Sequence, residues 1–158
     1  MKKIVISTFI LALLVSCTNR NTNSGSYYDF EVRCLGSELD GTITLESYGR
    51  GRNYSDASIQ AKKNAVSAVL FSGIKQGNSG CNRNPLISEI TRKNNEEFFA
   101  TFFADKGPFL DYVDVSDERI DNKISRDSKK SKNIQQRKVI VNVNVLKIKI
   151  LLKKNKLI

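Results

Sequence analysis

The chain contains no histidine and no tryptophan, and only two prolines and one methionine occur among its 158 residues. Without histidine it cannot build Ser-His-Asp or Cys-His catalytic sites or histidine metal sites, and it lacks the commonest general base. A hydrolase with two carboxylates stays open in principle, but the acidic residues at 96–97 and 111–117 lie in segments better explained as polar faces. We therefore expect no enzymatic activity, no cofactor and no metal site.

The apolar run at the N-terminus is too short for a membrane-spanning helix. It covers residues 4–16, whereas a spanning helix needs roughly 20 residues. Lys2 and Lys3 precede it, and this order of a basic start and a short apolar run is typical of a secretory signal. We expect residues 1–16 to be a signal peptide, with a transmembrane anchor as the weaker alternative.

The end of this run carries a recognisable motif. Residues 14–17 (Leu-Val-Ser-Cys) resemble the lipobox of bacterial lipoproteins, in which an aliphatic residue, a variable one and a small one precede cysteine. The resemblance implies that the Cys17 sulfur receives a diacylglyceryl group, that cleavage follows before Cys17, and that several acyl chains then anchor the protein stably. Thr18 replaces the aspartate that directs retention in enterobacterial sorting, which implies the outer membrane. An ordinary cleaved signal is the alternative.

Charge is distributed unevenly after the signal. Residues 17–118 contain 11 Lys and Arg against 14 Asp and Glu, whereas residues 119–158 contain 13 against 2. Such a basic region can bind lipid phosphate, lipopolysaccharide, an acidic glycan or an acidic protein. Export makes nucleic acid a poor candidate. A solvated charged face is the favoured alternative to a specific anion site.

The remaining cysteines form an even set. If Cys17 carries lipid, Cys34 and Cys81 are left in an oxidising compartment, which predicts a disulfide worth about 2–4 kcal/mol. Two buried, unpaired thiols are the alternative. Residues 17–26 are polar and should form a lipidated flexible tether, so residues 27–158 are expected to make a single domain.

The first half of that domain predicts a β-hairpin followed by a helix. Residues 28–34 and 42–48 alternate between apolar and polar side chains, and turn chemistry lies between them. The sequence Gly-Arg-Gly-Arg-Asn at 49–53 is expected to break the second strand, and Ser55 to cap the helix. Gly73 should end this helix in the left-handed conformation. Four alanines recur on one face and predict close packing on a sheet: Ala57, Ala61, Ala65 and Ala68.

The glycine-rich stretch also supports a sharper hypothesis. Arg50, Gly51 and Arg52 lie between a strand and a helix N-terminus, where backbone N–H groups can bind phosphate. A dinucleotide fingerprint would need a third glycine at position 54, where Tyr54 stands. Glycines with positive φ in a tight turn are the favoured alternative.

The second half is less regular. A short helix over 85–92 and a second one capped by Asn95 are expected, with Gly107-Pro108 ending the latter and residues 109–115 extended. Phenylalanines at 98, 99, 102 and 103 favour core packing over a docking surface. Residues 116–133 predict a long exposed basic connection, and 139–145 a strand. For residues 146–158 we favour a terminal helix over a continued strand.

This order of hairpin, glycine-rich turn, alanine-rich helix (Ala61, Ala65, Ala68), late strand and terminal helix resembles a group of small bacterial outer-membrane lipoproteins. Their fold is similar to the N-terminal domains of a flagellar assembly protein and of the Tol-system β-propeller protein. The resemblance implies an α+β fold, a small mostly antiparallel sheet with helices on one face. It also implies a non-catalytic interaction or structural role in the cell envelope, with an envelope protein as partner. No functional residue is carried over from it.

Overall fold

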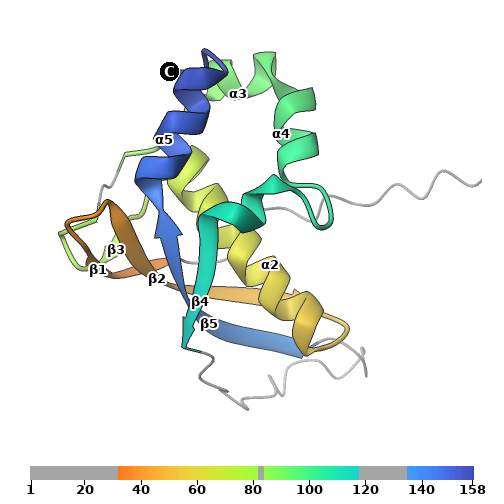
Figure 1. Ribbon diagram of the computed structural model, residues 1–158. Helices are drawn as coiled ribbons and strands as arrows, with labels where there is room; N and C mark the ends of the chain where they lie inside the picture. The colour runs from red at the N-terminus through yellow and green to blue at the C-terminus, as the bar shows by residue number, and fades with distance from the viewer. Residues whose placement is uncertain (1–31, 82–83, 118–134) are drawn as a thin grey trace, which may run out of the picture.

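The computed structural model describes residues 32–81, 84–117 and 135–158. Five strands form one sheet in the order β3-β1-β2-β5-β4, in which only the β1–β3 pair is parallel. The strands are β1 (Arg33–Ser37), β2 (Thr42–Gly51), β3 (Gln76–Gly77), β4 (Val113–Asp117) and β5 (Gln135–Asn144). The helices are α2 (Tyr54–Ser67), α3 (Glu89–Asn94), α4 (Glu96–Phe102) and α5 (Val145–Lys154). This confirms the predicted α+β fold with a mostly antiparallel sheet (Figure 1).

The predicted hairpin is present as β1 and β2. Its strands pair antiparallel, and their connecting turn contains Gly41 at a φ of 82°. β1 extends through Gly36 to Ser37, with a register shift after Cys34, so the turn is shorter than expected. Of the first predicted strand, residues 28–31 lie outside the described part of the chain.

The central strand β2 runs further than the sequence predicted. The expected break at Gly49 is wrong, because β2 continues to Gly51 and pairs with β5 along its whole length, from Thr42 opposite Asn144 to Gly51 opposite Gln135. Along β2 and β5, alternate side chains are buried beneath α2, and the intervening ones are half-exposed on the other face.

Helix α2 lies across the buried face of the sheet, as Figure 1 shows. Its N-cap is Asn53 and not the predicted Ser55, since the Asn53 side chain accepts a hydrogen bond from the Asp56 backbone N–H at 2.9 Å. The predicted small-residue stripe is confirmed: Ala57, Ala61 and Ala65 are fully buried. A Cβ at Gly49 would collide with the Ala57 carbonyl oxygen and the Ala61 nitrogen, so the glycine permits this contact.

The end of α2 widens into a π-helical turn, Ala68–Ser72. Gly73 ends it with a positive φ of 71°, but its ψ of 169° is not the left-handed helical conformation that we predicted. The wide turn leaves carbonyl groups for another partner. The Leu86 and Ile87 backbone N–H groups donate to the carbonyls of Val69 and Leu70, at 3.2 and 2.9 Å.

The short helices differ most from expectation. The predicted helix at 85–92 is wrong in its start, because α3 begins at Glu89, and Ser88 caps it by accepting from the Thr91 N–H at 3.1 Å. α4 already ends at Phe102, before Gly107-Pro108. The expected extended segment from 109 is instead a 3-10 turn, Pro108–Tyr112, ahead of β4.

The phenylalanine cluster belongs to the core, as predicted. Phe99, Phe102 and Phe103 are each at most 6% exposed, and Phe98 packs against Phe99 with ring centroids 5.1 Å apart. A fully buried Phe109 contacts Phe103, with centroids 5.8 Å apart. These rings fill the space between α2, α4 and the 3-10 turn.

The last strand and helix are confirmed. Val139, Val141 and Val143 of β5 are buried, and the chain turns directly into α5 at Val145. Asn144 caps this helix, accepting from the Lys147 backbone N–H at 2.8 Å. Most of the predicted connection at 116–133 lies outside the described residues.

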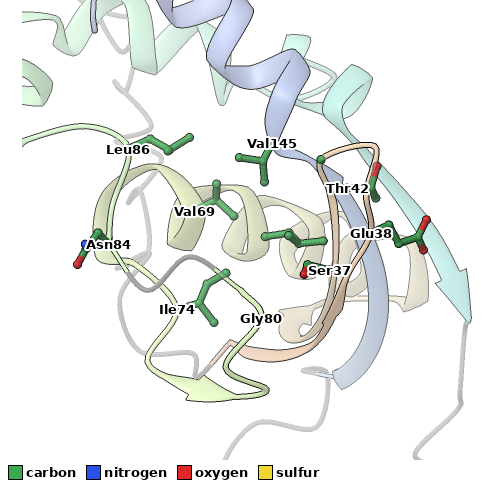
Figure 2. A pocket seen from close by; sticks show the side chains of 11 residues that line it. Ser37, Glu38, Thr42, Val69, Ile74, Gly80, Asn84, Leu86 and Val145 are labelled. Atoms are coloured by element: carbon green, nitrogen blue, oxygen red, sulfur yellow. The ribbon is translucent and has the colours of Figure 1, made fainter.

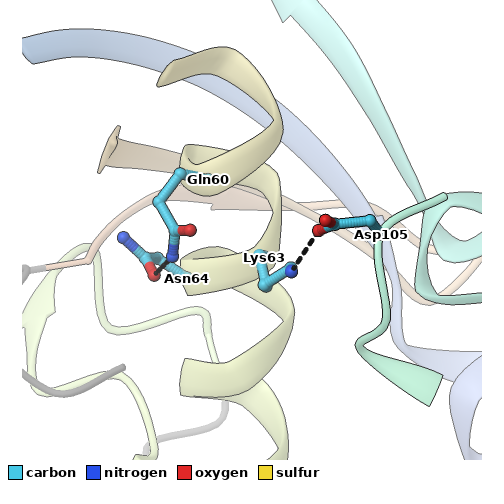
Figure 3. A network of polar contacts seen from close by, with 4 residues as sticks. All are labelled: Gln60, Lys63, Asn64 and Asp105. Carbon is cyan, nitrogen blue, oxygen red and sulfur yellow. Dashed lines mark hydrogen bonds and ion pairs between the residues drawn. The ribbon is translucent and has the colours of Figure 1, made fainter. Parts of the chain in front are cut away.

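Two neighbouring polar side chains of α2, Lys63 and Asn64, have partners, as Figure 3 shows, whereas the Oγ of the buried Ser58 has none among the described residues. The buried Asn64 donates to the Tyr48 carbonyl at 2.8 Å and accepts from Gln60 at 2.9 Å. The Lys63 ammonium lies 3.6 Å from the Asp105 carboxylate at the surface. Lys63 is nearly buried and Asp105 is fully exposed, so the ion pair lies at the edge of the core, where the ammonium group reaches the surface.

Candidate binding surface

The two cysteines that were expected to pair do form a disulfide. Cys34 of β1 and Cys81 of the loop after β3 are bonded, with their Cα atoms 6.1 Å apart and a sequence separation of 47. Both are buried, at 2% and 4% exposure. The predicted disulfide is therefore confirmed, and the alternative of two unpaired thiols is wrong. The predicted lipidation site, Cys17, lies outside the described residues.

A pocket of about 190 Å³ opens near this disulfide, with Gly80 in its lining. Figure 2 shows the residues that line it. Its walls are mainly apolar and come from β2, the π-helical turn, the loop after it and the start of α5. The apolar lining side chains are Ile43, Val69, Ile74, Leu86 and Val145. Ser37, Glu38, Thr42 and Asn84 supply polar groups to the lining. A space of this size suits a small apolar group, such as part of a side chain or an acyl chain.

The disulfide holds one wall of this pocket in place. Gly80, next to Cys81, lines the pocket, so the bond to Cys34 fixes this part of the loop against β1. Two further contacts support the same wall: β3 pairs with β1, and the Asn78 N–H donates to the Cys34 carbonyl at 2.9 Å. Gly77 has a φ of 94°, and a Cβ there would collide with the Cys34 backbone. The loop thus has a fixed path although its sequence is polar.

The β1–β2 turn and α5 form the rim of the same pocket. The Val145 N–H donates to the Gly41 carbonyl at 3.1 Å, and a Cβ on Gly41 would lie 2.9 Å from the Leu146 Cβ. Leu39, at the tip of this turn, is fully exposed, and Leu146 is 53% exposed. This end of the molecule therefore combines an apolar pocket with exposed apolar side chains.

The exposed side of α5 is strongly basic. Residues 135–158 contain seven Lys and Arg and no Asp or Glu, and five of these cations are lysines of α5 and the residues just after it. Lys147, Lys149, Lys153 and Lys154 are all exposed. The sequence placed the positive charge in this region correctly, but it left the conformation of 146–158 open, so the side chains that share a face could not be named.

The predicted anion-binding turn is not formed. Arg50 and Gly51 belong to β2, and the Arg50 Nε donates across the sheet to Gln136 at 3.2 Å. Gly51 lies against the first turn of α2, where a Cβ would collide with the Ala57 nitrogen. Its φ is not positive, nor is that of Gly49, so the tight-turn alternative is also wrong. Of the three predicted residues, Arg52 alone lies between the strand and the helix, where it is exposed and precedes the N-cap Asn53.

The described residues offer few groups for chemistry. Within them, no three His, Cys, Asp or Glu side chains gather closely enough to hold a metal ion. Burial, and secondly the neighbouring Asp111, raise the pKa of Tyr112 above its ordinary value of 10.0. This phenol packs against Phe102, with ring centroids 5.8 Å apart. In the same part of the chain, no helix has the length and apolar character needed to cross a bilayer.

Comparison with known proteins gives no relative from which a function can be transferred. No family model matches the chain, and neither a curated protein nor a solved structure matches it significantly. The resemblance to small outer-membrane lipoproteins therefore stays a prediction.

Proposed function

We propose that the chain is a bacterial lipoprotein, anchored through Cys17 in the cell envelope at the outer membrane, and that it acts there as a non-catalytic interaction or structural module. The observation that carries the proposal is the motif Leu-Val-Ser-Cys at 14–17, directly after two lysines and a short apolar run. Basic start, length, small residue and cysteine each match what lipid attachment requires.

The disulfide supports export. Structural disulfides persist in oxidising compartments outside the cytoplasm and are rare within it. Cys34 and Cys81 are bonded, and the bond secures a pocket wall, so oxidation contributes to the folded form. With both thiols consumed, Cys17 is the one cysteine of the three left for lipid.

A binding role fits the chemistry better than catalysis does. The chain has no histidine, and the pocket is lined mainly by aliphatic side chains, which bind by burying apolar surface. We therefore propose neither a cofactor nor a nucleic-acid partner. The partner is an envelope protein that covers the pocket.

A second candidate function is a module that binds anionic envelope ligands, namely lipid phosphate, lipopolysaccharide or acidic glycan. The observation that favours it is the presence of seven Lys and Arg residues, and of no Asp or Glu, in residues 135–158. Salt separates the two candidates. Binding through exposed lysines should weaken steeply between low and moderate ionic strength, whereas a packed protein interface should change little.

Cell fractionation tests the proposal. We expect the wild-type protein in the membrane fraction, resistant to high-salt washing, and the Cys17→Ala variant to lose that resistance. Ser16→Ala is the matched control, since alanine keeps the small residue before the cysteine and should leave the protein membrane-bound. A Cys17→Ala protein that stays as tightly bound as the wild type contradicts lipid anchoring at this residue.

A further inference from the structure

The outer side of α5 has an ordered arrangement of apolar and basic residues. Ile148 and Leu152 face the core, at 0% and 1% exposure, whereas Leu146 and Ile150 are 53% and 59% exposed. Leu146 and Ile150 are four residues apart, so they are neighbours on the helix surface. They form an apolar stripe that points away from the domain.

Lysines flank this stripe on both sides. At about 100° per residue, Lys149 and Lys153 project on one side of it, and Lys147 and Lys154 on the other. We call Leu146, Ile150 and these four lysines the α5 face. Lysine stems can lie along apolar surface while their ammonium groups reach outward to anions. The α5 face thus has the pattern of a helix that lies on a membrane surface, with apolar residues central and cations at the margins.

The lysines of the α5 face have no acidic partners among the described residues. No Asp or Glu occurs in residues 135–158, and the described ion pairs involve Lys63, Lys93 and Lys138. Two acidic elements pack against α5: the β1–β2 turn, which contains Glu38 and Asp40, and the 3-10 turn, which contains Asp111. The exposed side of α5 itself carries lysines and no Asp or Glu, so it is complementary to an anionic surface.

We propose that the α5 face docks on an anionic phospholipid bilayer, so that the domain lies against the membrane that anchors it. This inference rests on the proposed function for its second argument. From Cys17 to Val32 the chain spans 15 residues, which reach at most about 50 Å when extended. An anchored domain therefore always lies near the bilayer, where even a weak contact is populated because its effective concentration is high.

A groove on another protein is a poorer fit. Helices that bind in grooves use apolar anchors over two turns or more, at spacings i, i+3, i+4 and i+7. On the α5 face, the third and seventh positions after Leu146 are Lys149 and Lys153. Two apolar residues bordered by four lysines suit a shallow, negatively charged surface.

If α5 docks on the bilayer, the opposite end of the β2–β5 ladder faces away from the membrane. β2 and β5 pair over ten residues, with Asn144 at the α5 end and Gln135 opposite Gly51 at the other. Ten paired residues span about 30 Å. Ser55, which is exposed at the start of α2, lies at the far end and serves as a matched control position.

The experiment uses the full lipidated chain in vesicles, with an environment-sensitive fluorophore on Ile150→Cys or on Ser55→Cys. Lipid occupies Cys17 and the disulfide occupies the other two cysteines, so the introduced thiol is the one that reacts. In phosphatidylglycerol-containing vesicles, the label at 150 should shift to shorter wavelength and resist iodide quenching, while the label at 55 stays accessible. In pure phosphatidylcholine both labels should be accessible.

Neutralising the four lysines to glutamine should abolish the protection at 150, since each cation near an anionic surface changes partitioning about fivefold. Circular dichroism of the variant checks that it folds. Equal accessibility at 150 and 55 in anionic vesicles overturns the inference, as does protection that appears only in native membranes containing other proteins. Intact mass measured beforehand tests lipid on Cys17 separately. If that lipid is absent, the proposed function fails, and sedimentation of the same chain with anionic vesicles decides the α5 inference alone.

Discussion

At Gly49 the lack of a side chain decides how closely α2 approaches the sheet. A Cβ there would collide with the backbone of Ala57 and Ala61, whereas a Cβ at Gly36 of β1 would meet nothing within 4 Å. The two glycines lie in neighbouring strands and neither has a positive φ, so they differ in packing and not in backbone strain.

We predict that Gly49→Ala destabilises the domain by about 1–3 kcal/mol, because the added methyl group pushes α2 off β2. Gly36→Ala should change the free energy of unfolding by less than about 0.5 kcal/mol. Urea unfolding followed by circular dichroism measures both. Equal effects of the two substitutions would show that helix–sheet contact is not the reason for Gly49.

Single residues also show where sequence patterns mislead. Both Asn53 and Ser55 are good N-cap residues, and propensity cannot choose between them. Packing between β2 and α2 decides between them. Gly49 and Gly51 of β2 lie against the first turns of α2, and this contact places the start of the helix directly after the strand, with Asn53 as the N-cap. The same contact explains why these glycines do not form a phosphate-binding turn. It depends on tertiary packing, which a local motif does not contain.

Among the elements, the loop between the π-helical turn and α3 depends most on covalent support. It carries no long strand or helix, yet it supplies Ile74 and Leu86 to the pocket wall. Its supports are the Cys34–Cys81 disulfide, the short β3 pairing and two hydrogen bonds to the π-helical turn.

We predict that the Cys34→Ser/Cys81→Ser double variant is less stable than the wild type by about 2–4 kcal/mol, because the unfolded chain regains the entropy of a 47-residue loop. Thermal or urea unfolding measures the loss. Adding reductant should destabilise the wild type to a similar extent and leave the double variant unchanged. A variant as stable as the wild type would show that β3 and the hydrogen bonds hold the loop without the bond.

Elements with a strong repeating pattern were predictable, and short ones were not. The hairpin, α2 and β5 have alternating or helical periodicity over many residues, and all are present, whereas the pattern of α5 was also compatible with a continued strand. α3 and the 3-10 turn have six and five residues, too few to show a period. The π-helical turn arises because the Leu86 and Ile87 N–H groups bind the carbonyls it leaves free, a pairing distant in sequence. The pocket depends on that pairing, so it could not be predicted from local sequence patterns.

For the whole molecule, the two ends of the β2–β5 ladder have different surfaces. The α2 end carries exposed polar residues such as Arg52 and Ser55, whereas the α5 end carries the pocket, the exposed Leu39 and the α5 face. This difference between the two ends suits a domain tethered to a bilayer, in which one end binds the membrane or a partner and the other end faces solvent. Charge by region was readable from the sequence, but its placement on one helix face needed the fold.

The central claim is that Cys17 attaches this domain to the membrane, and mass spectrometry of the protein extracted from membranes tests it most directly. The account predicts a mature chain that begins at Cys17 and carries a diacylglyceryl adduct there, with the adduct absent from the Cys17→Ala variant. Cys34 and Cys81 should be found as one disulfide-linked pair of peptides in both proteins. A mature chain with an unmodified Cys17, released into the soluble fraction, would contradict the lipoprotein assignment.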